Sequence, residues 1–110
     1  MSLAYSTAEF RRAPRESVDY PSRIRGRRLA PTTALIVNIS PYGCMVRCDR
    51  IMPIGTMLEV DLPGMASRRG TVIWSLGARM GLEFETGISV ESYLALLPQM
   101  KASFSSPAPT

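Results

Sequence analysis

The chain has 110 residues, a formal net charge of +4 and no histidine. This length fits a single domain with a buried core, and no apolar run is long enough to cross a bilayer. Without histidine the chain cannot build a Ser-His or Cys-His nucleophile pair, and two cysteines are too few for a structural zinc site. We therefore expect a protein that is not an enzyme and that holds no metal or cofactor.

The positive charge is concentrated in the first half of the chain. Residues 1–50 carry nine arginines against four acidic residues, whereas residues 51–110 carry four cationic and five acidic residues. A codon preference for arginine explains the excess of arginine over lysine, but it explains this uneven placement less well. Because a guanidinium suits phosphates and base edges better than an ammonium does, the N-terminal half is predicted to face an anionic partner.

The two ends of the chain carry no periodic strand pattern. The N-terminus lacks a charged start followed by an apolar block, so no signal peptide is predicted, and a cytoplasmic protein without membrane insertion is expected. We interpret residues 1–9 as a flexible lead-in and residues 10–97 as one domain. Residues 98–110, rich in Ser, Pro and Ala, are interpreted as a disordered tail.

Six short segments between turn residues have the alternation or the β-branched composition of strands. They span residues 17–25, 32–39, 44–48, 57–62, 69–75 and 79–85. In the predicted strands 44–48, 57–62 and 79–85, the side chains expected to face inward are Cys44, Val46, Cys48, Leu58, Val60, Leu62, Met80, Leu82 and Phe84. Six short strands followed by one helix predict a mainly β fold, a six-stranded antiparallel β-barrel with a short C-terminal α-helix.

The helix is predicted from a change of period after the last strand. Ser89 is a favourable N-cap residue, and an apolar stripe at helical spacing follows it, formed by Val90, Tyr93, Leu94 and Leu97. Pro98 is expected to end or kink this helix after about two turns, since proline lacks the N–H that the helix requires.

Several conspicuous residues have an ordinary structural interpretation. The methionines, including Met45, Met57 and Met80, are expected to fill the core, and Trp74 is expected in the core or the barrel wall. The arginines of the first connecting loop are interpreted as solvated, with a minor alternative that they help to hold phosphate; they are Arg25, Arg27 and Arg28.

Two polar clusters remain, and the predicted pairing of strands brings them together. The first contains Arg11, Arg12 and Arg15, just before the first strand; the second contains Asn38, Ser40 and Gly43, at the end of the second strand. If these two strands pair as a hairpin, the start of one lies beside the end of the other. Each cluster alone is more often a set of solvated charges or a turn, but together they predict one site.

This combination of side chains suits guanine and phosphate. Arginine makes a paired contact to O6 and N7 of guanine and clamps phosphate with two parallel hydrogen bonds. Asn38 offers a donor and an acceptor to a base edge, and Ser40 adds a hydroxyl. Gly43 lacks a Cβ atom, so that a ligand or a neighbouring backbone can come close.

The pattern Arg11-x-x-x-Arg15 followed by Asn38-x-Ser40-x-x-Gly43, with the later strand Gly81-Leu82-Glu83-Phe84, resembles the PilZ domain, a bacterial receptor for cyclic di-GMP. The resemblance covers about residues 10–97 and implies a six-stranded antiparallel barrel. It also implies that Arg11 and Arg15 bind phosphate and guanine, and that Asn38, Ser40 and Gly43 contact the other face of a guanine. Arg12 lies in the variable part of the first motif and is kept as a candidate ligand-binding residue.

The sequence thus predicts a cyclic di-GMP receptor that signals to an unidentified effector protein when its N-terminal arginine arm orders onto the barrel. One alternative is an adaptor with the same barrel that binds proteins but no nucleotide. Another is a small basic barrel for single-stranded nucleic acid, which the scarcity of exposed aromatic residues near the arginines disfavours. We therefore expect no nucleic acid polymer as partner.

Overall fold

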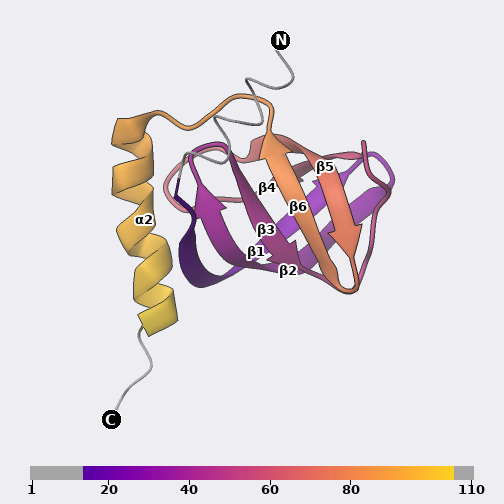
Figure 1. Cartoon of the computed structure of the whole chain (residues 1–110), viewed down its shortest axis with the longest axis horizontal. Coiled ribbons are helices and arrows are strands. Elements are labelled where there is room, and N and C mark those ends of the chain that lie inside the picture. Colours follow the sequence, from indigo (N-terminus) through magenta and orange to yellow (C-terminus); the bar gives the residue numbers. More distant parts are fainter. Residues whose placement is uncertain (1–13, 106–110) are drawn as a thin grey trace.

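A computed structural model describes residues 14–105 of the chain, which form a closed antiparallel barrel of six strands with one helix beside it (Figure 1). Around the barrel the strands follow the order β1-β2-β3-β6-β5-β4. The elements are β1 (Glu16–Gly26), β2 (Leu29–Ser40), β3 (Gly43–Arg47), β4 (Met57–Val60), β5 (Arg68–Leu76), β6 (Arg79–Phe84) and α2 (Val90–Ser105). The predicted fold class is confirmed, and each predicted strand matches an observed one to within two residues at either end, except that β2 begins three residues earlier than predicted, at Leu29.

The barrel interior is the hydrophobic core. All nine side chains that alternation placed inward, from Cys44 to Phe84, are less than 9% exposed, because strict alternation puts every second side chain on the same face of a strand. Val18 and Ile24 of β1 and Ile36 and Ile39 of β2 complete the wall between the first two strands. The core therefore fixes which face of each strand points outward.

Strands β1, β2 and β5 each depart from regular pairing, and in β2 and β5 a β-bulge of one extra residue changes the direction of the next side chain. In β2 the pairing with β3 steps from Ile36 to Asn38, leaving Val37 as the extra residue. In β5 the pairing with β6 steps from Val72 to Trp74, leaving Ile73 as the extra residue. Ile36 and Val72 are fully buried, whereas Asn38 and Trp74 are half-buried on the outer surface.

Helix α2 lies beside the barrel against β1 (Figure 1). The Ser89 hydroxyl accepts a hydrogen bond from the Ser92 N–H at 3.1 Å, which confirms the predicted N-cap. The predicted apolar stripe is correct only in part. Val90 and Leu94 are 70% and 61% exposed, and the side chains that face the barrel are Tyr93, Leu96 and Met100, with Leu97 partly buried.

Of the two outcomes expected for Pro98, an end or a kink of the helix, the first is wrong, because α2 continues to Ser105. The prediction of disorder from residue 98 is wrong as far as residue 105 for the same reason. Two contacts beyond the proline hold the last part of the helix on the barrel. Met100 is fully buried, and the Lys101 Nζ atom lies 2.9 Å from the Glu16 Oε1 atom at the start of β1. Residues 1–13 and 106–110 lie outside the described part, so the predictions of a flexible lead-in and of the end of the tail stay untested.

Candidate functional site

The two predicted clusters meet at one corner of the barrel. In the β1–β2 hairpin Ser17 pairs with Asn38, and the Arg15 Nη1 atom donates a hydrogen bond to the Asn38 Oδ1 atom at 3.2 Å. Those two residues are 23 positions apart in the sequence. The strand pairing predicted from the sequence is thus the reason why an arginine ahead of β1 reaches an asparagine near the end of β2.

The bulge at Val37 gives Asn38 its outward direction. Ile36 and Ile39 are both fully buried, and alternation from Ile36 would turn Asn38 inward without the extra residue. The Asn38 Nδ2 atom lies 3.9 Å from the Met45 Sδ atom on β3, a weak hydrogen bond that fixes the amide from its other side. The amide is therefore held between Arg15 and Met45 rather than turning freely.

The turn from Ser40 to Gly43 joins β2 to β3 and is held from several sides. The Ser40 side chain is fully buried, and its oxygen accepts a hydrogen bond from the Tyr42 N–H at 3.1 Å. The carbonyl groups of Pro41 and Tyr42 accept hydrogen bonds from Ile88 and Phe84, each at 2.8 Å. Ser40 thus shapes the turn from inside, and a contact of its hydroxyl with a base stays a prediction.

Gly43 begins β3 and is buried between two neighbouring strands, pairing with Ser40 of β2 and Glu83 of β6. Among the described residues, positive φ angles occur at Gly55, Gly64 and Gly77. Gly43 is not one of them, so its backbone angle does not demand glycine. The close approach of a ligand or a neighbouring backbone at Gly43 stays a prediction.

Helix α2 supports the same corner from behind. The Tyr93 hydroxyl donates a hydrogen bond to the Ile39 carbonyl at 3.1 Å, between Asn38 and Ser40 in the sequence. Burial, with the nearby Glu16 carboxylate as the second cause, raises the pKa of Tyr93 to about 12. The helix therefore contacts both strands that carry the candidate residues, β2 through Tyr93 and β1 through the Lys101–Glu16 ion pair.

The positive charge of Arg15 also acts on Cys44 in β3. Cys44 is buried, and desolvation raises the pKa of its thiol to about 12, while the positive charge of Arg15 acts in the opposite direction. Cys44 and Cys48 are both free, and both are buried, as the alternation predicted. The thiols are thus parts of the core, and the Arg15 guanidinium lies close enough to Cys44 to lower the pKa of its thiol.

Sequence reasoning missed a continuous row of outward positions that runs from this corner around the barrel. Asn38 pairs with Met45, Met45 pairs with Gly81, and Gly81 pairs with Trp74. The indole of Trp74 lies across Gly81, where a Cβ atom would overlap it. Trp74 is therefore a wall residue on the outer face, and the expectation that Met45 fills the core is wrong.

The row begins and ends beside a bulge, at Val37 and at Ile73. Bulges are common beside functional sites because they turn one side chain without displacing the strand. The signal in the sequence is an apolar run that breaks alternation, Leu35-Ile36-Val37 in one strand and Val72-Ile73-Trp74 in the other. Such a run does not reveal which residue is the extra one.

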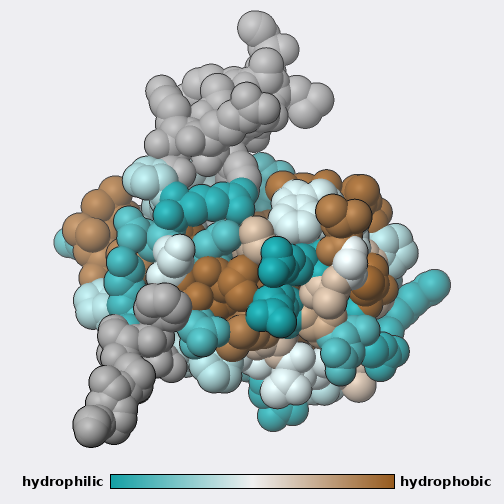
Figure 2. All heavy atoms as spheres, turned by 60° about the horizontal axis from the view of Figure 1, so that its bottom comes forward, coloured by the Kyte–Doolittle hydropathy of each residue, from teal (hydrophilic) through white to brown (hydrophobic). Residues whose placement is uncertain are grey.

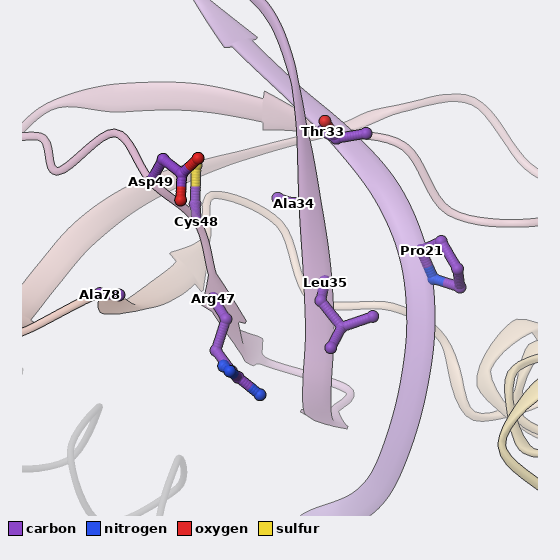
Figure 3. Close-up of a pocket in the computed structure, with 8 residues that line it drawn as sticks. All are labelled: Pro21, Thr33, Ala34, Leu35, Arg47, Cys48, Asp49 and Ala78. Atoms are coloured by element: carbon purple, nitrogen blue, oxygen red, sulfur yellow. The ribbon is translucent and has the colours of Figure 1, made fainter.

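Two hollows on the described surface lie away from the corner. The smaller, of about 380 Å³, is formed by Pro21, Thr33, Ala34, Leu35, Arg47, Cys48, Asp49 and Ala78, with the side chains of Leu35 and Arg47 extending from neighbouring strands (Figure 3). The larger lies at the turn between β1 and β2. Neither is lined by Arg15, Asn38, Ser40 or Gly43.

Of the five other candidate arginines, three lie elsewhere on the barrel and two are not described by the structure. Arg11 and Arg12 lie outside the described residues. Arg25 forms ion pairs with Glu59 at 3.3 Å and Asp61 at 2.9 Å, and Arg27 and Arg28 form the turn between β1 and β2. This turn is separated from Ser17 by nine or more residues of strand, about 30 Å, so these three arginines do not reach the Asn38 corner.

Within residues 14–105 no group of three or more Cys, Asp or Glu side chains is arranged to hold a metal ion. Nor does that part of the chain contain a helix with the length and apolar character that crossing a membrane requires.

Comparison with known proteins assigns the chain to a family. The model of the PilZ domain matches residues 9–100, more than four-fifths of the sequence. The chain belongs to the PilZ domain family. PilZ domains are binding and adaptor modules, and the family is one of cyclic di-GMP receptors. No curated protein matches the sequence.

Proposed function

We propose that this PilZ domain is a cyclic di-GMP receptor whose ligand binds at the corner formed by Arg15, Asn38 and the turn from Ser40 to Gly43. The observation that carries the proposal is the hydrogen bond between Arg15 and Asn38. It joins the arginine motif to the asparagine motif in one place, which is what a ligand contacted by both motifs requires.

The chemistry of the corner suits one guanine and its phosphates. A guanidinium recognises the O6 and N7 atoms of guanine or clamps a phosphate, and Asn38 presents an amide to a base edge. Arg11 and Arg12 precede Arg15 by a few residues and supply the further positive charge that a dianionic ligand needs. Ser40 contributes by holding the turn, since its oxygen accepts the Tyr42 N–H.

The proposed switch is the ordering of the N-terminal arginine arm over this corner when the ligand binds. A ligand shifts a conformational equilibrium only through contacts that differ between the two states, and phosphate contacts made by Arg11 and Arg12 are of that kind. The ordered arm then presents a changed surface to an effector protein. The rigid turn and the supporting helix give the arm a fixed surface on which to order.

Isothermal titration calorimetry with cyclic di-GMP tests the proposal. We expect saturable binding, and we expect Arg11→Ala or Arg15→Ala to weaken it about 10- to 100-fold, from about 1–3 kcal/mol for a good paired contact. Arg28→Ala is the matched control, because it removes one exposed arginine from the opposite end of β1, and it should leave the affinity unchanged. Unchanged affinity in both site variants would refute the assignment.

The two alternatives give other results in the same titration. An adaptor that binds no nucleotide would release no heat with cyclic di-GMP. A protein for single-stranded nucleic acid would ignore the dinucleotide and bind long oligonucleotides with a steep dependence on salt.

A further inference from the structure

The larger hollow is a groove of about 1110 Å³ at the end of the barrel away from Asn38. The turn between β1 and β2 and the chain leading into β4 form its walls, and the apolar part of its lining includes Leu29, Met52, Pro53, Met57 and Leu58. On the face that Figure 2 shows, hydrophobic side chains lie in several groups, and one of these groups is at the end of the molecule away from α2. This groove has no part in the site described above.

Large apolar side chains are unusually exposed beside the groove. Ile51, Ile54 and Met57 are 51%, 67% and 47% exposed, which makes this short segment the source of half of the six large apolar side chains exposed in the described chain. Contiguous exposed apolar surface with a polar rim marks an interaction site more often than scattered apolar residues do. The expectation that Met57 fills the core is therefore wrong.

The exposure is not a result of loose structure. The Gly55 N–H donates to the Val72 carbonyl at 2.8 Å, and the Val72 N–H donates to the Thr56 carbonyl at 2.9 Å. The Thr56 hydroxyl donates to the Pro53 carbonyl at 2.6 Å. The segment is thus fixed on β5 with its isoleucines turned to the solvent.

The opposite wall approaches β4 closely at Gly26. A Cβ atom on this residue would lie 2.8 Å from the Leu58 Cδ2 atom and 2.9 Å from the Met57 carbonyl oxygen. Glycine therefore lets the turn between β1 and β2 lie against β4, and this contact holds the arginines of the turn beside the apolar floor.

The charge of the groove is strongly positive. Four arginines line it against a single glutamate, Glu59. Arg25 is neutralised by Glu59 and Asp61, and Arg69 lies 3.6 Å from Glu85. Within the described residues Arg27 and Arg28 have no carboxylate at ion-pair distance, and both are exposed.

We infer that this groove docks a segment of a partner protein in which acidic side chains alternate with large apolar ones. The acidic groups meet Arg27 and Arg28, and the apolar groups lie against the methionines and isoleucines, since flexible methionines adapt to different apolar partners. A single-stranded nucleic acid fits less well, because no aromatic side chain within residues 14–105 lines the groove for base stacking. As the output surface of a receptor the groove depends on the proposed function, whereas the docking itself does not.

The test is selection from a library of random 12-residue peptides against the full chain, followed by affinity measurement with the enriched peptides. We expect enriched sequences to combine Asp or Glu with Leu, Ile or Phe. The double variant R27E/R28E should weaken their binding about tenfold or more. The double variant R47E/R79E is the matched control, since it reverses two exposed arginines outside the groove, and it should bind within twofold of wild type.

Amide shifts in NMR spectra locate the peptide on this 12.1 kDa chain. We expect shifts in residues 25–31 and 52–59, whether or not cyclic di-GMP binds elsewhere, so that a failure of nucleotide binding and a failure of docking are separate results. The inference is overturned if no peptide is enriched, if R27E/R28E binds as wild type does, or if the shifts fall at Asn38 to Gly43. Binding of an oligothymidylate probe that moves the same amides and competes with the peptides would replace a protein partner by nucleic acid.

Discussion

At one end of the barrel the polar side chains are fixed, and at the other end the apolar side chains are exposed. Asn38 is held by Arg15 and Met45, and the turn that follows it is fixed by hydrogen bonds from two directions. At the opposite end Met57 and its neighbouring isoleucines are open to solvent beside Arg27 and Arg28, which form no ion pair within the described residues. A fixed polar corner suits a small ligand with defined hydrogen-bond positions, whereas an adaptable apolar groove suits a polypeptide.

Helix α2 accounts for part of this difference. It hydrogen-bonds to β2 and forms an ion pair with β1 at the corner, and none of the described residues of α2 lines the groove at the other end. The same two strands, β1 and β2, extend from one region to the other. The predictions below separate the two regions by changing one and measuring both.

The largest expected effect comes from treating Arg15 and Asn38 as a pair. Asn38→Ala should weaken cyclic di-GMP binding about tenfold, a value within the range of one lost paired contact. The double variant R15A/N38A should lose less than the sum of the two single losses, because contacting residues in one network are coupled by about 0.5–3 kcal/mol. Calorimetry on the four proteins measures this coupling, and strictly additive losses would show that the two residues act separately.

Removing the hydrogen bond that α2 makes to β2 should have a smaller effect, which is a loss of stability. Tyr93→Phe deletes the donor to the Ile39 carbonyl and should lower the free energy of unfolding by about 1 kcal/mol. Tyr20→Phe is the control, since Tyr20 is half-buried and its hydroxyl makes no hydrogen bond within the described residues. Urea unfolding followed by Trp74 fluorescence measures both variants, and equal stability of Y93F and wild type would show that the hydroxyl does not support the corner.

Alkaline pH should weaken the same end of the barrel. The pKa values of Cys44 and Tyr93 are both raised to about 12 in the folded chain, chiefly by burial. A group with a raised pKa stays protonated in the folded state at pH values where it has already lost its proton in the unfolded state. The stability that Cys44 and Tyr93 contribute in this way is therefore complete below about pH 9 and is lost as the pH rises toward 12. Unfolding midpoints between pH 7 and 10.5 should fall, and they should fall less steeply in Y93F.

The smallest effect is expected at the groove. Met57→Gln replaces a side chain that is 47% exposed, and surface substitutions of this kind change stability by about 0.5 kcal/mol or less. The variant should also bind cyclic di-GMP as wild type does while weakening the selected peptides. A loss of stability beyond about 1 kcal/mol would mean that Met57 belongs to the core after all.

Much of this architecture follows from the sequence because alternation is a local property. Leu58, Val60 and Leu62 alternate with acidic residues, and the interior of the barrel contains all three. The meeting of Arg15 and Asn38 was also predictable, because it follows from pairing two adjacent strands through a short loop. The shared row of Asn38 and Trp74 was not, since it depends on single extra residues at Val37 and Ile73 within apolar runs.

The course of α2 past Pro98 depends on distant contacts that a local rule does not include. Proline lowers helix stability by about 3 kcal/mol relative to alanine in a helix interior, and this cost predicted a helix end. The burial of Met100 and the contact of Lys101 with Glu16 offset that cost. The groove could not be predicted either, because a segment rich in methionine and isoleucine has the same composition whether it is exposed or lies in the core.

The most direct test of the central claim is an NMR titration of the labelled chain with cyclic di-GMP. We predict saturable shifts of the amides of Arg15 to Ser17, Asn38 to Ser40 and Tyr42 to Cys44, with the amides of the turn at Arg27 and Arg28 unmoved. Shifts confined to that turn, or no shifts at a saturating concentration, would contradict the assignment of the nucleotide to the corner of Arg15 and Asn38.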